Sequence, residues 1–260
     1  MDLLHVMLRA AEAAAAVIRE GAARRETLSW ESKGPADYVS EIDRAAETEI
    51  RVRMLRAFPQ AQMLAEEGWG GESVARGLSF VVDPLDGTTN FLHGVMEYAV
   101  SIAALEDGVP VAGVVLNAAR GDVYTATRGG GAFRDWERMR VSPLTEPAKA
   151  LIATGFPFKA MASLDVYAEQ FKAVAQRTAG IRRAGAAALD LANVASGRFE
   201  AFWELQLSPW DVGAGILLVR EAGGVATDLD GEEAQVRHGS FVAGSPAMHA
   251  WLMQTLRGIS

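Results

Sequence analysis

Two aspartates three positions apart, Asp83 and Asp86, form the part of this sequence best suited to chemistry. They follow an apolar run at 78–82, which is typical of a buried strand, and they precede Gly87, which lets the backbone approach a ligand closely. Residues 88–90 (TTN) then form a strong helix start. Because carboxylates hold hard cations and a helix N-terminus attracts phosphate, the segment predicts a metal-bridged phosphate site. The alternative, acids that only cap a helix, explains one aspartate but not both.

Four motifs of this chain resemble those of the inositol monophosphatase family of Mg²⁺-dependent, Li⁺-sensitive phosphatases. They occur in family order and are 33–43 (KGPADYVSEID), 66–67 (EE), 83–90 (DPLDGTTN) and 210–224 (WDVGAGILLVREAGG). Four ordered motifs are more specific than any one of them. The resemblance implies an α+β fold, the layered αβαβα sandwich of the inositol monophosphatase and fructose-1,6-bisphosphatase type, and an enzyme that hydrolyses phosphate monoesters.

The resemblance also implies which residues hold Mg²⁺, of which two to three ions are expected in each active site. Glu66, Asp83 and the backbone carbonyl of Leu85 would bind the first ion. Asp83, Asp86 and Asp211 would bind the second, so that Asp83 bridges the two ions. Several carboxylates from distant parts of the chain are what a two-metal phosphatase requires.

Three catalytic residues follow from the same resemblance. Thr88 would orient the attacking water, with Asp43 hydrogen-bonded behind it and Glu66 beside the metal. Thr88 is also explained as a helix cap, and both roles are compatible, whereas Asp43 is otherwise explained as a solvated or capping acid near a helix start. Lys33 resembles the flap lysine near the third, loosely held ion.

The remaining site residues are expected to bind the substrate. Phosphate oxygens would contact the N–H groups of Gly87 and Thr88, next to Asp86. Glu204 lies seven residues before Asp211 and matches the family acid that contacts substrate hydroxyls. The segment that would line the sugar site consists of Gly185, Ala186 and Ala187. Many relatives carry Ser or Thr at the position of Ala186, so this chain departs from them there.

Glu204, together with the Trp-Asp pair at 210–211, favours a small phosphorylated polyol, with myo-inositol 1-phosphate as the leading substrate. Fructose 1,6-bisphosphate, or another small phosphate ester of the same superfamily, is the alternative. A non-catalytic alternative is a regulatory or ribosome-assembly role through protein contacts, as for some bacterial relatives.

Composition limits the other classes of function. The 260 residues have a formal net charge of −8, and no basic run is present, so we expect no direct nucleic-acid binding. The chain contains no cysteine, no long uncharged apolar stretch and no basic segment at its N-terminus, so we expect a cytoplasmic protein without a membrane span or signal peptide. The family resemblance implies a homodimer.

The pattern along the chain predicts two halves, 1–145 and 146–260, with a boundary near the prolines at 143 and 147. The first half would contain a helix pair, an antiparallel sheet and the metal-binding motif, and the second half alternating strands and helices with the last metal ligand and the substrate pocket. Three glycines at 129–131 lack the lysine of a phosphate loop and predict a turn. The expected helices are 2–22, 40–57, 162–178, 185–197 and 211–222, and the expected strands of the first half are 78–83, 97–105, 109–117 and 121–126.

Overall fold

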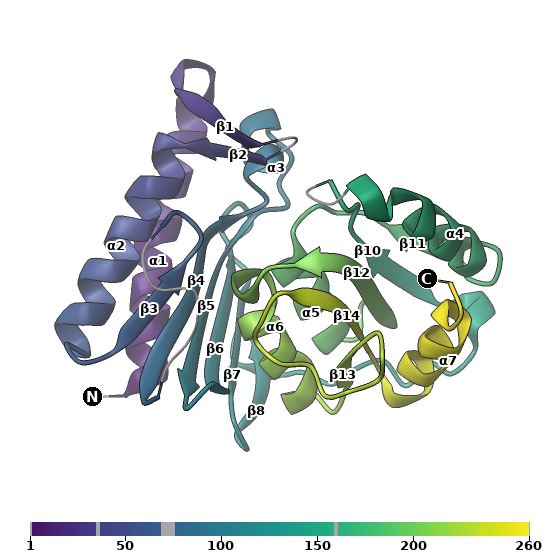
Figure 1. The fold of residues 1–260 in the computed structure, drawn as a ribbon. Coiled ribbons are helices and arrows are strands. Elements are labelled where there is room, and N and C mark those ends of the chain that lie inside the picture. The colour runs from purple at the N-terminus through teal and green to yellow at the C-terminus, as the bar shows by residue number, and fades with distance from the viewer. Residues whose placement is uncertain (1, 35–36, 69–75, 159–160, 260) are drawn as a thin grey trace.

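The computed structural model describes residues 2–34, 37–68, 76–158 and 161–259. Its helices and two larger sheets alternate in five layers, so the predicted αβαβα sandwich is confirmed (Figure 1). The helices are α1 (Leu3–Ala23), α2 (Glu41–Ala57), α3 (Thr88–His93), α4 (Leu164–Ala175), α5 (Ala187–Ala195), α6 (Pro209–Glu221) and α7 (Pro246–Leu256).

The first large sheet has seven strands in the order β3-β4-β5-β6-β7-β8-β9, which is also their order along the chain. Only β3 and β4 pair in parallel, and the other neighbours are antiparallel as predicted. The turn predicted at 129–131 joins β7 to β8. The strands are β3 (Gln62–Ala65), β4 (Leu78–Asp86), β5 (Ala99–Glu106), β6 (Val109–Asn117), β7 (Val123–Thr127), β8 (Gly131–Arg134) and β9 (Glu137–Arg138).

The second large sheet has five strands in the order β11-β10-β12-β14-β13. Its first three strands are parallel, and β14 runs antiparallel to both of its neighbours. A separate two-stranded hairpin, which the sequence pattern did not predict, precedes α2. The strands are β10 (Leu151–Thr154), β11 (Gly180–Arg182), β12 (Ala201–Leu207), β13 (Val225–Asp228) and β14 (Gly239–Gly244), with β1 (Trp30–Gly34) and β2 (Asp37–Ser40) in the hairpin.

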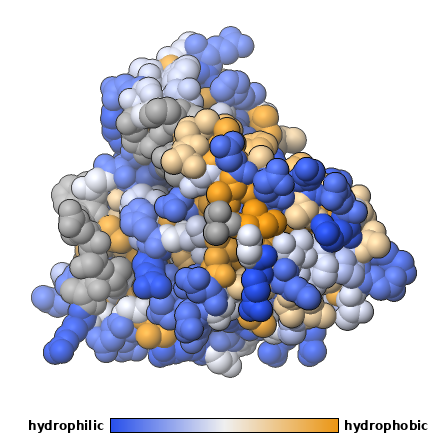
Figure 2. All heavy atoms as spheres, turned by 45° about the vertical axis from the view of Figure 1, so that its right-hand side comes forward, coloured by the Kyte–Doolittle hydropathy of each residue, from blue (hydrophilic) through white to orange (hydrophobic). Residues whose placement is uncertain are grey.

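Three apolar clusters fill the spaces between the layers. One packs α1 and α2 on the seven-stranded sheet, another packs α4 and α7 on the five-stranded sheet, and the third surrounds α5 and α6 between the two sheets. The middle layer therefore joins the two halves of the chain. Figure 2 shows that hydrophilic side chains cover most of one face, with an apolar band in its middle. No helix in the described ranges is long and apolar enough to span a bilayer.

The close contact of α5 with α6 requires a glycine. A Cβ atom built on Gly215 would lie 2.4 Å from Cδ1 and 2.7 Å from Cβ of Leu191, distances that real side chains do not tolerate. Since α6 also packs on β4, β5, β6 and β7, this contact sets the spacing between the middle layer and the first sheet.

We expect Gly215→Ala to lower the free energy of unfolding by about 1–3 kcal/mol, because an overpacked core strains its neighbours. The direction of the change in the free energy of unfolding is informative, because alanine in place of glycine at an open helix position would raise it by about 1 kcal/mol. Urea unfolding measures the change. Gly239→Ala is the control, because its Cβ would lie 3.7 Å from the nearest atom. Equal stability of Gly215→Ala and the native protein would contradict this account of the packing.

Candidate active site

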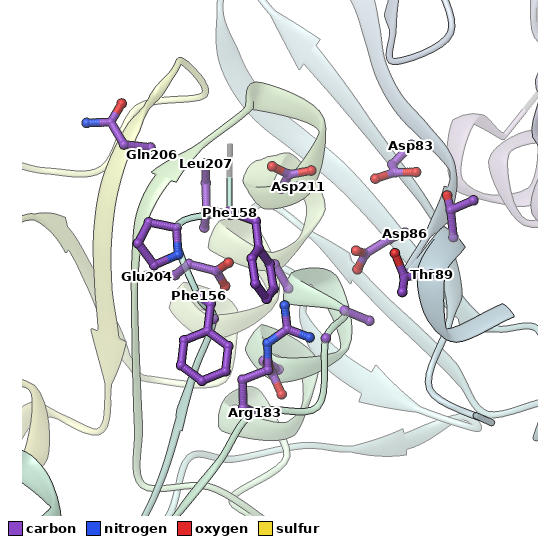
Figure 3. A pocket seen from close by; sticks show the side chains of 18 of the residues that line it. Asp83, Asp86, Thr89, Phe156, Phe158, Arg183, Glu204, Gln206, Leu207 and Asp211 are labelled. Carbon is purple, nitrogen blue, oxygen red and sulfur yellow. The ribbon is translucent and has the colours of Figure 1, made fainter. Parts of the chain in front are cut away.

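A cavity of about 370 Å³ lies where the ends of β4 and β12 meet the first turns of α3, α5 and α6. Asp83 and Asp86 point into it from one side, and Asp211 faces them from α6 (Figure 3). Glu66, which follows β3, lines the same cavity. The four predicted metal-binding carboxylates are therefore brought together from three separate parts of the fold. The predicted residues that line the cavity with them are Leu85, Gly87, Thr88, Gly185, Ala186, Ala187 and Glu204.

A bulge in β4 places both aspartates on one side of the strand. Asp83 lies opposite Ser101 of β5 and Asp86 lies opposite Ala99, so three steps along β4 match two steps along β5. In a regular strand, residues three apart face opposite sides of the sheet, and the extra residue of a bulge cancels that alternation.

Gly87 caps α3 immediately after the bulge. Its φ of +92° is a left-handed conformation that suits glycine, and a Cβ here would lie 2.8 Å from the carbonyl oxygen of Glu97. The sharp turn from β4 into α3 depends on this residue. It brings the start of α3 against the two aspartates.

Burial and like charge make the two central aspartates costly to ionise. Asp83 is 2% exposed, and burial followed by repulsion from Glu66 raises the pKa of its carboxyl well above the usual range. Burial followed by repulsion from Asp211 raises the pKa of Asp86 in the same way. Backbone N–H groups compensate only in part: Leu85 donates to Asp83 Oδ1 at 3.0 Å, and Ala188 donates to Asp86 Oδ2 at 2.8 Å.

Thr88 and Asp43 are in direct contact, as expected. The Thr88 hydroxyl donates to Asp43 Oδ1 at 2.8 Å. Asp43 also forms a capping box at the start of α2, where its Oδ2 accepts from the Ser40 N–H at 2.8 Å and from the Ser40 hydroxyl. Asp43 therefore combines the predicted hydrogen bond with Thr88 and the capping contact in one buried side chain. Burial raises the pKa of this carboxyl, which is 1% exposed.

A second capping box holds Asp211 in place. Asp211 is the third residue of α6, and its Oδ2 accepts from the Ser208 N–H at 2.7 Å. Pro209 begins the helix, where its missing N–H costs nothing. The capping box fixes the Asp211 carboxylate at the cavity edge of α6.

The start of α5 and Glu204 form the part of the cavity wall that the sequence analysis assigned to the substrate. Ala186 is the N-cap of α5 and provides no side-chain hydrogen bond. The N–H groups of Ala187 and Ala188 are instead directed at Asp86, whose ionised form they favour. Glu204 on β12 is half-buried and faces the cavity close to Gly155, where a Cβ would overlap its carboxylate. The side chain of Lys33, the predicted flap residue, lies outside the described part of the structure.

Two further parts of the cavity wall were not predicted from the sequence. Arg183 lies beside the adjacent rings of Phe156 and Phe158, and Asp190 lies on the buried face of α5. An acid among apolar helix residues was an available signal for Asp190. The sequence gives no comparable signal for the contacts of Arg183, because its aromatic partners lie far away in the sequence.

Within the described ranges, no three His, Asp or Glu side chains form a group already arranged to hold a metal ion. The donor set nevertheless fits a hard divalent cation. Four carboxylates line one cavity, two of them are buried, and a cation would relieve the repulsion that raises their pKa values.

Comparison with known proteins identifies the family. The model of the inositol monophosphatase family matches residues 2–260, and the chain belongs to this family. The chain is 44% identical to the Nus factor SuhB of Pseudomonas aeruginosa over 98% of this chain and 96% of that protein. It is also 44% identical to the inositol-1-monophosphatase of Rhizobium meliloti, over 94% of this chain and 91% of that protein.

Solved structures agree on the fold. The extragenic suppressor protein suhB from Bartonella henselae superposes with a TM-score of 0.93 at 42% identity, covering 98% of both chains. The Thermotoga maritima IMPase superposes with a TM-score of 0.90 at 30% identity, covering 100% of this chain and 98% of that one.

Asp190 generates a pH-dependent prediction. It is 1% exposed, its Oδ1 has no hydrogen-bond partner among the described residues, and burial raises the pKa of its carboxyl well above the usual range. The unfolded chain releases this proton near its ordinary pKa of 3.8 and the folded chain only at higher pH. Between those two values, rising pH favours unfolding by up to about 1.4 kcal/mol per pH unit.

We therefore expect Asp190→Asn to gain stability relative to the native protein as the pH rises from 5 to 8. Urea unfolding at each pH measures the difference. Asp165→Asn, an exposed position on α4, is the matched control and should follow the native profile. Parallel profiles for Asp190→Asn and the native protein would show that Asp190 ionises normally.

Proposed function

We propose that this member of the inositol monophosphatase family is a Mg²⁺-dependent phosphoric monoester hydrolase acting on a small phosphorylated polyol, with myo-inositol 1-phosphate as the leading substrate. The observation that carries the proposal is the contact of Thr88 with Asp43 beside four cavity-lining carboxylates. A hydroxyl held by a buried carboxyl and placed next to a cation-binding cluster is suited to positioning a water molecule.

The ligands proposed for Mg²⁺ are Glu66, Asp83, the Leu85 carbonyl, Asp86 and Asp211. When bound, Mg²⁺ supplies a water of lowered pKa and neutralises charge on the phosphate and on the leaving oxygen. Thr88 gives its own hydroxyl proton to the hydrogen bond with Asp43, so its oxygen is free to accept one from the attacking water. Phosphate oxygens then lie near the Gly87 and Thr88 N–H groups.

Glu204 is proposed to select the substrate. A half-buried carboxylate on the sugar side of the cavity accepts hydrogen bonds from ring hydroxyls, and a site built in this way discriminates against esters that lack them. Ala186 offers no hydroxyl of its own there, which increases the share of recognition that falls to Glu204.

Two alternatives differ in class. Fructose 1,6-bisphosphate or another small ester would use the same carboxylates, so the choice of substrate separates these activities. A regulatory role through protein contacts is favoured by the similarity to proteins named Nus factor SuhB. Phosphate release from myo-inositol 1-phosphate, measured with Mg²⁺ and with EDTA, separates catalysis from a purely regulatory role.

The homodimer and the cytoplasmic location inferred from the sequence remain part of the proposal, and light scattering tests the former.

We expect Asp83→Asn to lower kcat by at least about 10³-fold at saturating Mg²⁺, because the substitution removes the proposed bridging charge while leaving the shape unchanged. Phosphate release from myo-inositol 1-phosphate measures this, and circular dichroism confirms that the variant is folded. Asp165→Asn makes the same chemical change on exposed α4 and should retain full activity. Near-native turnover of Asp83→Asn would refute the two-metal proposal.

Glu204→Gln should lower kcat/KM for myo-inositol 1-phosphate about 10-fold or more, because hydrogen bonds to a charged acceptor are stronger than those to an amide. The same variant should change kcat/KM for p-nitrophenyl phosphate by less than about 3-fold, since that ester has no ring hydroxyls. The ratio of the two kcat/KM values is compared, because a smaller fraction of active enzyme would lower both values equally and leave the ratio unchanged. An unchanged ratio would mean that Glu204 does not contact the polyol.

A further inference from the structure

Asn90 belongs to the motif at 83–90, but the proposed reaction gives it no role. It is the third residue of α3, it is half-buried, and it is not among the described residues that line the cavity. Its Nδ2 donates to the carbonyl oxygen of Glu97 at 2.6 Å and to that of Ala184 at 2.8 Å. Because both neighbours are acceptors, only the nitrogen end of the amide can face them, and its two hydrogens serve one carbonyl each.

These two hydrogen bonds join segments that lie far apart in the sequence. Glu97 is in the loop between α3 and β5, whereas Ala184 is 94 residues beyond Asn90, in the loop between β11 and α5. Both acceptors are backbone groups, so a substitution at position 97 or 184 would keep them. The connection between the two loops therefore depends on the side chain of Asn90.

Two glycines in left-handed conformations make the close approach possible. Gly185 has a φ of +91°, and a Cβ there would lie 3.0 Å from Nδ2 of Asn90. Gly87 has a φ of +92°, and its Cβ would lie 2.8 Å from the carbonyl oxygen of Glu97, the same atom that accepts from Asn90. The start of α3 and the two loops thus meet through backbone atoms, with little space for another arrangement.

Asp86 holds the same segment at its other end. Its Oδ2 accepts from the N–H of Ala188 at 2.8 Å, while Asn90 donates to the carbonyl of Ala184. One motif therefore binds residues 184–188 at both ends, through an acceptor at one end and a donor at the other. This pair of bonds fixes both the distance and the orientation of the start of α5 relative to the carboxylates.

We propose that Asn90 is a positioning residue for substrate selectivity, which holds residues 184–188 at the distance from the carboxylates that fits the alcohol part of a polyol phosphate. The proposal rests on the proposed function. Residues 185–187 line the cavity and Asn90 does not, so Asn90 acts through their backbone. A wall that is already in place needs no ordering when the substrate enters, which favours an ester that contacts this wall.

Amide hydrogen exchange, followed by NMR, tests the positioning without any catalysis. Asn90→Ala removes both donors, and Asn90→Asp presents a carboxylate of the same shape to the two carbonyls. In each variant the amide of Ala188 should exchange at least about 10-fold faster than in the native protein, because the segment has lost one of its two attachments. Amides of β6 report global unfolding and should keep their protection.

Asn193→Asp is the matched control for the exchange measurement. It makes the same chemical change on α5, where the Asn193 Oδ1 accepts from Arg198 at 3.3 Å and has no contact with the loops around Asn90. Exchange at Ala188 should therefore remain at the native rate in this variant.

The kinetic test uses the same two variants of Asn90. Each should lower kcat/KM for myo-inositol 1-phosphate about 10-fold and change the value for p-nitrophenyl phosphate by less than about 3-fold, since the second ester has no ring hydroxyls. Faster exchange at Ala188 together with this selective loss supports the inference. Unchanged exchange at Ala188, an equal acceleration in β6, or equal losses on both esters would overturn it. A native protein that releases phosphate from neither ester would instead refute the proposed function, whatever the exchange rates show.

Discussion

Repulsion among buried carboxylates is the constraint on which the rest of this structure depends. Asp83 and Asp86 lie in a cavity with Glu66 and Asp211, and their raised pKa values express the cost of keeping like charges together away from water. A flexible protein would relieve that cost by moving the acids apart. The layers prevent this, because the acids are fixed to β4, to the segment after β3 and to α6, and the middle apolar cluster holds these elements together.

Helix capping provides the local part of that fixation. Asp43 and Asp211 are both third residues of capping boxes, so each carboxylate satisfies a backbone N–H and is oriented at the same time. Capping had been the competing explanation for acids in these motifs. In Asp43 the capping bond and the hydrogen bond from Thr88 occur together, so capping does not exclude the contact that the sequence predicted.

Much of the fold was predictable because its signals are local. The alanine-rich α1, the strands of the first sheet and the glycine turn after β7 follow from periodicity and turn residues. The β1–β2 hairpin was missed because its strands are short and polar, and its aromatic pair, Trp30 with Tyr38 at 5.1 Å, forms only when the strands are paired. The contacts of Arg183 with Phe156 and Phe158 were missed for a related reason, since the two aromatic residues belong to a different loop from the arginine.

The start of α5 shows why the residues proposed to bind the substrate were harder to predict from the sequence than those proposed to bind the metal. A helix with alanine as its N-cap, here Ala186, has no side-chain cap, and its first N–H groups would ordinarily be free for a ligand. Here they are directed at Asp86, so this helix end stabilises a proposed metal ligand. The side chains that reach the cavity from β12 and from the loop after β11 include Glu204 and Arg183. These two carry opposite charge, and their placement depends on the packing of the five-stranded sheet, which no single motif encodes.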